Sequence, residues 1–358
     1  MDYQTHIRFD EEVDFEIIPY RIQFKKPART SRDTLHEREI FFLKLFYKKN
    51  KNQYGLGECS PIYGLSPELK ENVLGDMSNC ALSLKSEQQI DFTSINSPAI
   101  RFCMEMACLD LLLGTKRMFT SNSSFSPIPI NGLVWMNSVD LMKDEGLEKI
   151  FSGYTTVKFK VGAERFADEL EMLRYVRSTF PENRITIRLD ANGAFAENEV
   201  FEKLEAMSAF QIHSIEQPVK QGRWALMKDI ILHSPIPIAL DEELVGIDTI
   251  EEKRQLIEAL KPAYIVLKPM LHGGIGGCMD WIKVTEGTNT RYWVTSMLET
   301  SVGLNAIAQW VSTLNPSMPQ GLGTGGLYTN NLPAAWETKE GYLHFKGTDS
   351  LAEFTFEE

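Results

Sequence analysis

The sequence predicts a modified TIM barrel, an α/β barrel, that carries a separate α+β capping domain. The chain has 358 residues, which is long enough for a barrel and a second, smaller domain. From Ile128 onward, short β-branched or apolar runs alternate with amphipathic stretches long enough for helices. Parallel strands need such crossover helices, so the alternation favours a parallel barrel, with a doubly wound open sheet as the alternative.

The capping domain is expected over residues 1–122. Three closely spaced runs rich in β-branched and aromatic residues predict an antiparallel meander, and two apolar helical patterns follow. The second pattern stops at Gly114, a common end for a helix. The expected strands cover residues 17–24, 39–47 and 53–58, and the expected helices cover residues 67–84 and 98–113.

The barrel is expected over residues 123–330, after a serine-rich linker at residues 120–126. Residues 331–358 are expected to return to the capping domain, because residues 341–356 alternate like a strand. The expected barrel strands cover residues 129–134, 156–161, 186–190, 212–217, 236–241, 264–268, 292–296 and 320–324; helices are expected at 163–180, 197–209, 224–233, 249–260, 275–286 and 302–314.

Composition restricts the partners and the compartment. The formal net charge of −12 and the lack of a basic stripe argue against nucleic acid. Residues 1–14 do not resemble a signal peptide, and no apolar run approaches a membrane span, so we expect a cytoplasmic protein without a membrane partner. The five cysteines form no CxxC pair, which predicts reduced thiols rather than a zinc site. The sequence does not indicate an oligomeric state.

Ionisable residues end five of the expected barrel strands. Successive members are separated by about 25 to 30 residues, the length of one strand-plus-helix unit, so their side chains should emerge at the same end of the barrel. A single charged residue at a strand end is usually the solvated start of a loop, but five in consecutive units favour a common site. These residues are Lys160, Asp190, Glu216, Asp241 and Lys268.

The three carboxylates among them, Asp190, Glu216 and Asp241, predict a site for a hard divalent cation. Carboxylates brought together without a cation would repel one another and raise each other's pKa. All-oxygen ligation favours Mg²⁺, with Mn²⁺ as the alternative metal. Bound between two lysines, such an ion suits removal of a proton α to a carboxylate, because it stabilises the enediolate and lowers the pKa of a lysine base.

The motifs around these residues resemble the enolase superfamily, specifically its muconate-lactonizing subgroup. The resemblance covers nearly the whole chain, including a segment similar to the family's capping domain, YGLGECSPIYGLSPE. Lysine or histidine bases working with Mg²⁺ are the known pattern of this superfamily. The barrel motifs that carry the resemblance are VKFKVG, RLDANGAF, SIEQPV, IALDEEL, VLKP and TSMLETSVGL.

The resemblance implies a role for each matching residue. Lys160, the second lysine of a K-x-K motif, would be one base, and Lys268 the opposing lysine; Asp190, Glu216 and Asp241 would be the metal ligands. Strand alternation is expected to turn Glu242 away from the site. The implied substrate-binding residues are Lys158, Arg188, Asn192 and Ser296, with a salt-bridge role as the alternative for Lys158 and Arg188.

Within the subgroup, the motifs RLDAN, SMLETSVGLNAIAQW and GLGTGGLYTNNL are most similar to those of o-succinylbenzoate synthases. This likeness implies a small-molecule carboxylate substrate and dehydration of 2-succinyl-6-hydroxy-2,4-cyclohexadiene-1-carboxylate in menaquinone biosynthesis. Lys160 would take the α-proton and return it to the departing hydroxyl, while Lys268 would stay protonated and stabilise the enediolate.

Two alternatives remain at this point. The first is a racemase of N-acylamino acids or a dipeptide epimerase of the same subgroup. The epimerases carry Asp-x-Asp on the last barrel strand to hold the substrate amine. This chain has Gly321, Leu322, Gly323 and Thr324 there, which argues against a free amine. The second is a barrel of another class, one that binds a metal or a carboxylate without catalysis.

Three further segments have weaker signals. Residues 273–277, GGIGG, do not have the G-x-G-x-x-G spacing of a dinucleotide-binding loop. They predict a flexible loop before a helix N-terminus, which could meet an anionic group of the substrate. His272 is expected to be a loop residue. Residues 25–38 are expected to form a loop over the site, whose cations could bind a succinyl carboxylate: Arg29, Arg32 and Arg38.

Overall fold

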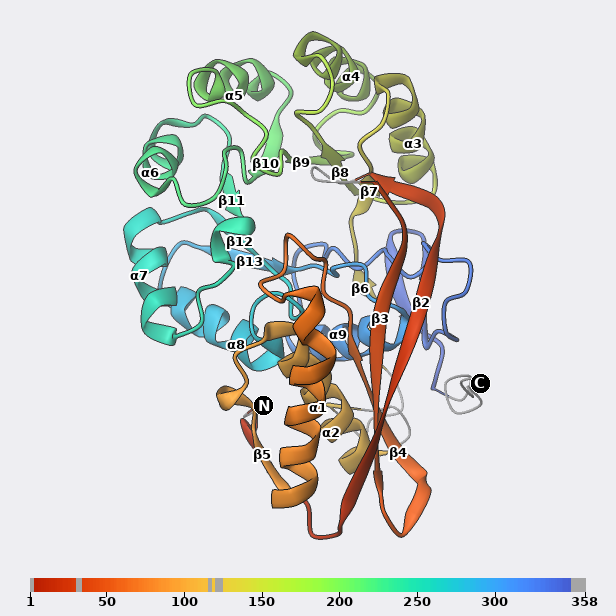
Figure 1. Ribbon diagram of the computed structural model, residues 1–358. Helices are drawn as coiled ribbons and strands as arrows, with labels where there is room; N and C mark the ends of the chain where they lie inside the picture. Colours follow the sequence, from red (N-terminus) through yellow and green to blue (C-terminus); the bar gives the residue numbers. More distant parts are fainter. Residues whose placement is uncertain (1–2, 30–33, 115–117, 120–124, 349–358) are drawn as a thin grey trace.

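The computed structural model describes residues 3–29, 34–114, 118–119 and 125–348. A ring of helices surrounds a parallel sheet, and a smaller unit of helices and antiparallel strands lies against the ring (Figure 1). This is the predicted modified barrel with a capping domain. No helix in the described ranges has an apolar stretch long enough to cross a membrane.

The capping unit is built on a three-stranded antiparallel sheet with the order β2-β3-β4. Helix α2 packs closely on this sheet, because a Cβ atom at Gly57 would lie 2.0 Å from the carbonyl oxygen of Cys103. Only glycine allows that approach. The elements of this unit are β1 (His6–Arg8), β2 (Val13–Arg29), β3 (Thr34–Tyr47), β4 (Asn50–Cys59), α1 (Lys70–Glu87), β5 (Gln89–Asp91), η1 (Phe92–Ser94) and α2 (Pro98–Leu113).

The expectation of a loop at residues 25–38 is wrong for the described part of that segment. Strand β2 continues to Arg29 and β3 begins at Thr34, with Ala28 opposite Leu35. A register shift after Gln23 lets the polar residues continue as a hairpin. Charges and proline are tolerated there because β2 is an edge strand. Arg32 and the side chain of Arg29 lie outside the described residues.

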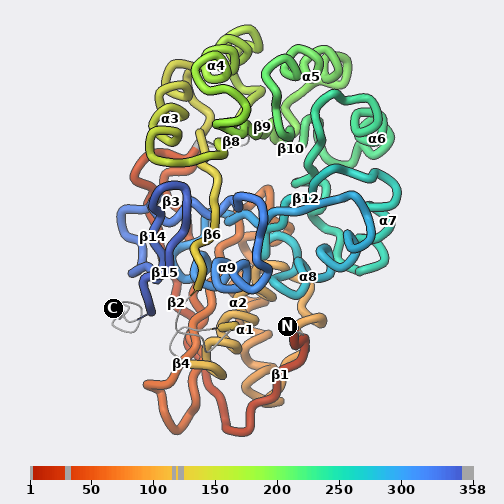
Figure 2. Tube along the Cα trace, turned by 180° about the vertical axis from the view of Figure 1, so that it is seen from behind, coloured from red at the N-terminus to blue at the C-terminus, as the bar shows by residue number. Residues whose placement is uncertain are grey.

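The barrel contains one parallel sheet of seven strands, ordered from β13 to β7. Each neighbouring pair is joined by a helix on the outside of the ring, seen from behind in Figure 2. The strands are β7 (Gly132–Val134), β8 (Thr156–Lys160), β9 (Thr186–Asp190), β10 (Ile212–Glu216), β11 (Ile238–Leu240), β12 (Tyr264–Leu267) and β13 (Arg291–Val294). The helices are α3 (Val139–Phe151), α4 (Phe166–Thr179), α5 (Val200–Ser208), α6 (Trp224–His233), α7 (Ile250–Leu260), α8 (Gly274–Thr285) and α9 (Ser301–Thr313), with the short turn η2 (Glu242–Leu244) after β11.

The eighth strand, expected at residues 320–324, is replaced by two isolated bridges. Gln320 bridges to Ile130, and Gly321 bridges to Thr295. Backbone hydrogen bonds on both sides of these two residues close the ring between β13 and the segment before β7. Glycine is needed at this closure, because a Cβ atom at Gly321 would lie 1.6 Å from Oγ1 of Thr295.

Helix α3 was not expected from the sequence. Gly146 interrupts its helical pattern, since glycine is a poor helix former. The structure explains the glycine: a Cβ atom there would lie 2.7 Å from the ring of Phe159 on β8. Tertiary packing therefore outweighs local propensity at this position.

The expected strand at residues 129–134 is divided in two. Strand β6 (Ile128–Pro129) pairs with β15 (Tyr342–Phe345), whereas β7 belongs to the barrel sheet. Strand β15 also pairs with β14 (Trp336–Lys339). The described C-terminal strands therefore pair with β6 rather than with a strand of the capping sheet. Contact with the cap is made slightly earlier, where Asn330 bonds to β2. The domain boundaries at residues 122 and 330 stay predictions.

The GGIGG segment is not a free loop before a helix. Residues Gly274 to Gly277 form the first turn of α8 and are buried against α2. The carboxylate of Glu105 on α2 accepts hydrogen bonds from the backbone N–H groups of Ile275, at 2.6 Å, and Gly276, at 3.2 Å. The end of α8 therefore meets an anion of the chain itself, and the expectation that it meets an anionic substrate is wrong.

The five cysteines are free thiols, as expected. Burial raises the pKa of Cys103 and of Cys108, so both stay protonated.

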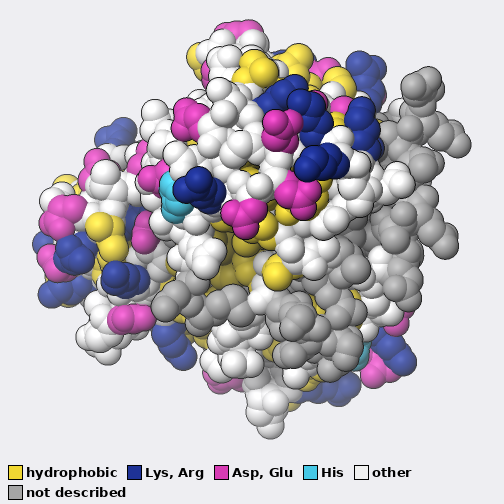
Figure 3. Space-filling view, turned by 90° about the horizontal axis from the view of Figure 1, so that it is seen from below, with side chains coloured by type: hydrophobic (Ala, Val, Ile, Leu, Met, Phe, Trp, Pro, Cys, Tyr) yellow, Lys and Arg dark blue, Asp and Glu magenta, His cyan; other side chains and the backbone are white. Residues whose placement is uncertain are grey.

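On the face of the molecule seen from the cap end, Lys and Arg side chains are interspersed with Asp and Glu (Figure 3).

Candidate active site

A cavity of about 190 Å³ lies where the carboxyl ends of the barrel strands face the capping unit. Its barrel side carries charged and polar groups, and its cap side is apolar. The cap contributes Leu35 from β3 and Ile62 from the segment after β4. The predicted site residues that line it are Lys158, Lys160, Asp190, Asn192, Lys268 and Ser296.

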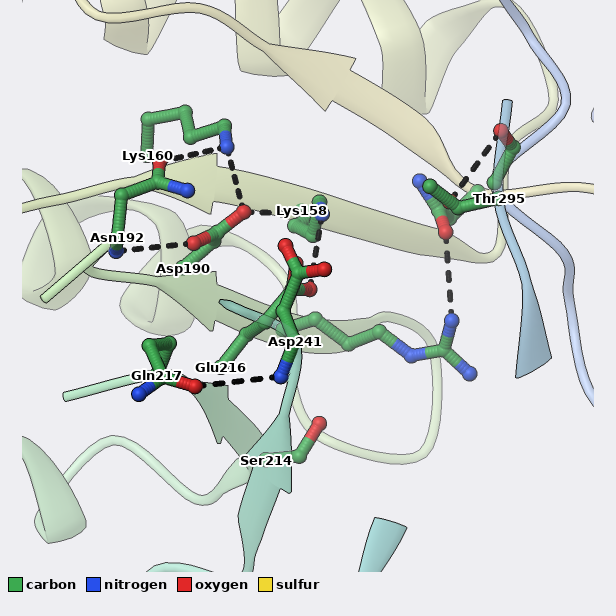
Figure 4. A network of polar contacts seen from close by, with 12 residues as sticks. Lys158, Lys160, Asp190, Asn192, Ser214, Glu216, Gln217, Asp241 and Thr295 are labelled. Carbon is green, nitrogen blue, oxygen red and sulfur yellow. Dashed lines mark hydrogen bonds and ion pairs between the residues drawn. The ribbon is translucent and has the colours of Figure 1, made fainter. Parts of the chain in front are cut away.

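Lys160 ends β8 and points toward the end of β9. Its Nζ lies 2.5 Å from Oδ2 of Asp190 and 2.7 Å from Oδ1 of Asn192 (Figure 4). Asn192 has a positive φ of 44°, a conformation that asparagine tolerates better than most residues. Its backbone N–H donates to Oδ1 of Asp190 at 3.1 Å. The turn after β9 thus brings an amide oxygen to the lysine.

Lys158 lies two residues before Lys160, on the same face of β8. Its Nζ bridges Oδ2 of Asp190, at 3.1 Å, and Oε2 of Glu216, at 2.9 Å. Burial lowers the pKa of Lys158, but the charges of Glu216 and Asp190 outweigh it and leave the pKa raised. Lys158 is therefore a permanent cation between two carboxylates. This is the salt-bridge role given above as its alternative.

Lys268 follows β12 and forms an ion pair with Oδ2 of Asp241. Burial lowers its pKa, whereas the charge of Asp241 raises it, and the net shift is upward. Lys160 and Lys268 are thus held by carboxylates of two different strands and open into one cavity.

The three carboxylates expected as metal ligands are fully buried and close to the same lysines. Burial raises the pKa of Glu216 to about 8, and the charge of Asp190 adds to that rise. Burial also raises the pKa of Asp241, although Lys268 opposes it. Asp190 differs, because Lys160 and Lys158 outweigh burial and lower its pKa.

The fit of this cluster to a cation can be tested on its oxygens. In the part of the chain that the structure describes, no three His, Cys, Asp or Glu side chains have the arrangement of a metal site. Ammonium groups stand between the carboxylates instead. Yet Oε1 of Glu216 and Oδ1 of Asp241 are buried without a hydrogen-bond partner. Unpartnered carboxylate oxygens beside a third carboxylate are the donors that a hard divalent cation prefers, so the donor set fits.

Arg188 and Ser296 lie in different surroundings. Arg188 donates to the carbonyl oxygen of Pro319 at 2.8 Å and stacks over the ring of Trp293 at 4.2 Å. It joins β9 to the closing segment below the cavity and is not among the described residues that line it. Ser296 lines the cavity, and its hydroxyl pairs with that of Thr324 at 2.6 Å.

The expectation that Glu242 turns away from the site is wrong. Strand β11 ends at Leu240, and Asp241 leaves the strand conformation with a ψ of −82°. Strand alternation therefore no longer applies at Glu242, which begins η2 and lines the cavity. Glu243, by contrast, does face away and accepts a hydrogen bond from Nε2 of Gln217 at 3.1 Å.

Two residues of the site, Gln217 and Trp135, had no distinct signal in the sequence. Gln217 directly follows Glu216, has a positive φ of 41°, and its side-chain oxygen accepts from the backbone N–H of Asp241 at 3.3 Å. It positions one expected ligand from the strand of another. Trp135, just beyond β7, lines the cavity. Aromatic side chains occur in every core, so its type alone could not reveal this place.

His272 and Arg38 lie beside the cavity wall and are not among the described residues that line the cavity. His272 is buried in the turn after β12, and its Nδ1 accepts from the backbone N–H of Lys268 at 3.0 Å. Burial holds its pKa well below the usual range, so the ring is neutral. Arg38 is buried and donates to the carbonyl oxygens of Ser60 and Leu298 rather than opening into the cavity.

Comparison with known proteins agrees with this geometry. The family model for enolase C-terminal domain-like proteins matches residues 142–347. The chain belongs to the enolase superfamily. It is 38% identical to o-succinylbenzoate synthase from Desulfotalea psychrophila (strain LSv54 / DSM 12343), over 89% of this chain and 95% of that protein. The predicted superfamily, the barrel with its cap, and the likeness to o-succinylbenzoate synthases are thereby confirmed, as is the prediction of a lyase-type enzyme.

Solved structures extend the comparison. The crystal structure of MenC from Desulfotalea psychrophila LSv54 matches with a TM-score of 0.81 and 33% identity, covering 93% of this chain and all of that one. A dipeptide epimerase from Enterococcus faecalis V583, complexed with Mg and the dipeptide L-Leu-L-Tyr, has the same fold, with a TM-score of 0.78 at 19% identity over 96% of this chain and 98% of the other. L-Ala-D/L-Glu epimerase from Bacillus subtilis (strain 168) is 23% identical over 82% of each chain.

Proposed function

We propose that this enzyme dehydrates 2-succinyl-6-hydroxy-2,4-cyclohexadiene-1-carboxylate to o-succinylbenzoate, a step of menaquinone biosynthesis, with Mg²⁺ or alternatively Mn²⁺ as its metal. The observation that supports it best is the pairing of Lys160 and Lys268 with different carboxylates at the floor of one cavity. Likeness to the Desulfotalea synthase over most of both chains selects dehydration among the reactions of the superfamily.

Asp190, Glu216 and Asp241 would hold the metal. When bound there, a divalent cation supplies positive charge that stabilises a substrate enediolate. Two of these carboxylates, Asp190 and Asp241, keep the ammonium groups of Lys160 and Lys268 near the cavity floor, and Glu216 pairs with Lys158.

Lys160 would act twice. Its neutral amine removes the proton α to the substrate carboxylate, and the resulting ammonium donates that proton to the departing hydroxyl on the same face. One C–H and one C–O bond break, the ring becomes aromatic, and water leaves. Lys268, whose raised pKa keeps it cationic, would face the anionic intermediate. Ser296 and Asn192 are the proposed polar contacts of the substrate on the cavity wall.

The apolar part of the cavity suits the cyclohexadiene ring. Leu35, Ile62 and Trp135 surround it and would exclude water during proton transfer. A small-molecule carboxylate is the expected partner, because the ammonium groups of Lys160 and Lys268 open into the same cavity. Cytoplasmic location remains the expectation.

Racemisation of N-acylated amino acids is the second candidate. It is favoured by one observation, that both lysines open into the same cavity, because a racemase needs one base for each face of its substrate. A dipeptide epimerase is less well supported, because the closing segment presents Gly323 and Thr324 to the cavity and neither offers a carboxylate for a free amine.

Product analysis tests the proposal. The enzyme with Mg²⁺ is given the cyclohexadiene substrate and, separately, a panel of N-succinyl amino acids. Formation of o-succinylbenzoate alone supports the synthase, and racemisation alone replaces it with the second candidate. Failure to turn over either, with binding of Mg²⁺ retained, would favour the non-catalytic barrel.

A further inference from the structure

Both ends of the side-chain amide of Asn192 form hydrogen bonds with other side chains. Its Oδ1 accepts from Nζ of Lys160 at 2.7 Å, and its Nδ2 donates to Oε1 of Glu242 at 3.0 Å. An ammonium group only donates and a carboxylate only accepts. The orientation of the amide is therefore fixed by its two neighbours, with the oxygen toward the lysine.

Glu242 is suited to hold this orientation. Its side chain is only 6% exposed, and its first carboxylate oxygen is occupied by Asn192. Its second oxygen, Oε2, is buried without a hydrogen-bond partner, so the bond to Asn192 is the one described hydrogen bond that anchors this carboxylate. The turn η2 directs Glu242 into the cavity wall, where strand alternation would have turned it away.

We infer that Glu242 is a positioning residue for the proton transfers of Lys160, and that it acts through Asn192. Without the carboxylate, the amide can rotate and present its NH₂ group to the lysine, which would remove one of the two acceptors that aim Nζ. Asn192 is then first a relay between two side chains, and contact with substrate is a secondary role. This inference deepens the proposed function and rests on it.

A double-mutant cycle separates this relay from a general structural role. The four proteins are the wild type, Glu242→Leu, Asn192→Ala and the double variant, each assayed for kcat and KM with the cyclohexadiene substrate. Leucine has no acceptor for Nδ2 of Asn192, so Glu242→Leu should lower kcat about tenfold and change KM less than twofold. In the Asn192→Ala background, Glu242→Leu should have no further effect. Additive losses, or a loss carried mainly by KM, would overturn the relay.

Glu242→Gln is the matched comparison. It removes the charge but keeps a side-chain oxygen that can accept from Nδ2 of Asn192. It should therefore recover most of the kcat that Glu242→Leu loses. A loss in Glu242→Gln as large as that in Glu242→Leu would mean that the missing charge or a disturbed η2 is responsible, and the relay would be discarded.

Failure of this inference is distinguishable from failure of the proposed function. Absence of dehydration by the wild type rejects the synthase. The same cycle is then measured as Lys160-dependent exchange of the α-proton of an N-succinyl amino acid with D₂O. Additivity in either assay rejects the relay alone.

Discussion

Arg38 of the capping unit donates a hydrogen bond of 2.7 Å to the carbonyl oxygen of Leu298, a residue of the barrel that lines the cavity. Leu298 has a positive φ of 63°, a costly conformation for leucine. The hydroxyl of Tyr328 donates to the same oxygen at 2.5 Å. The cap thus stabilises a strained part of the cavity wall, although the arginine does not itself touch the space for substrate.

Arg38→Lys should therefore weaken substrate binding. A lysine cannot reproduce the fork that reaches the carbonyl oxygens of both Leu298 and Ser60. We expect KM to rise about tenfold, or about 1.4 kcal/mol, with kcat changed less than threefold. Arg21→Lys is the matched control, because the side chain of Arg21 is exposed and, among its described contacts, pairs only with Glu37 at 3.5 Å. Equal KM values in the two variants would contradict this role.

Lys160→Ala should abolish exchange of the substrate α-proton with D₂O and lower kcat by about 10²- to 10⁴-fold, the usual contribution of a general base. Its other neighbours, Asp190 and Asn192, stay in place, so the response of thermal stability to Mg²⁺ should be retained. Exchange is followed by NMR. Persistence of exchange in this variant would remove Lys160 from the mechanism.

Mg²⁺ should stabilise the folded chain. At a concentration of 100 times its Kd, a ligand that binds only the native state adds about 2.7 kcal/mol to the free energy of unfolding. Asp241→Asn and Glu216→Gln should lose this response, because each removes a carboxylate with an unpartnered oxygen. The response should survive in Glu337→Gln, which removes an exposed carboxylate on β14, and disappear on adding a chelator. Thermal unfolding measures all of these, and an undiminished response in both ligand variants would place the ion elsewhere.

Glu299 should make stability depend on pH. Burial raises its pKa from 4.5 to about 7, and nearby Glu58 adds to the rise. The pKa of Glu299 is higher in the folded state than in the unfolded state, so the folded state binds the proton more tightly. The contribution of this proton to the free energy of unfolding is fully present below pH 4.5 and is lost as the pH rises through 7. Relative to Glu299→Gln, the wild type should lose up to about 3 kcal/mol between pH 4.5 and pH 8. Urea denaturation at both pH values checks this, and a constant difference would refute it.

Gly277→Ala should destabilise the contact between α8 and the turn before it. A Cβ atom at this position would lie 1.9 Å from the carbonyl oxygen of His272, which is backbone and cannot move aside cheaply. We expect a loss of about 2 to 4 kcal/mol. Gly75→Ala in α1 is the control: a Cβ atom there meets nothing within 4 Å, so the variant should gain about 0.5 to 1 kcal/mol. If Gly277→Ala does not lower the free energy of unfolding relative to Gly75→Ala, the turn before α8 adapts to the added methyl group.

The strand ends that carry the proposed site residues could be predicted from the sequence, because apolar runs that end in an ionisable residue recur at a regular spacing. Lys160, Asp190 and Glu216 are the last residues of β8, β9 and β10, and Lys268 directly follows β12. Apolar runs and crossover helices suffice to bring such positions to one end of a barrel.

What could not be predicted depends on departures from regular structure. Glu242 enters the cavity because the chain leaves β11 as a turn, and no periodic pattern shows where alternation stops. The buried glycines before Cys278 fit around Glu105, which is 170 residues from Ile275 in sequence. The hairpin around Ala28 exceeded its expected length because edge pairing tolerates polar residues.

The stretch from Gln320 to Leu332 closes the barrel, then lines the cavity at Thr324, and then packs on the capping sheet. This one segment therefore contributes to the barrel closure, to the cavity wall and to the packing of the cap. Replacing the whole segment, as loop grafting does when a new specificity is sought, would disturb the barrel and its contact with the cap at the same time. Engineering of this enzyme should therefore leave residues 320–332 intact and vary cavity residues outside this segment.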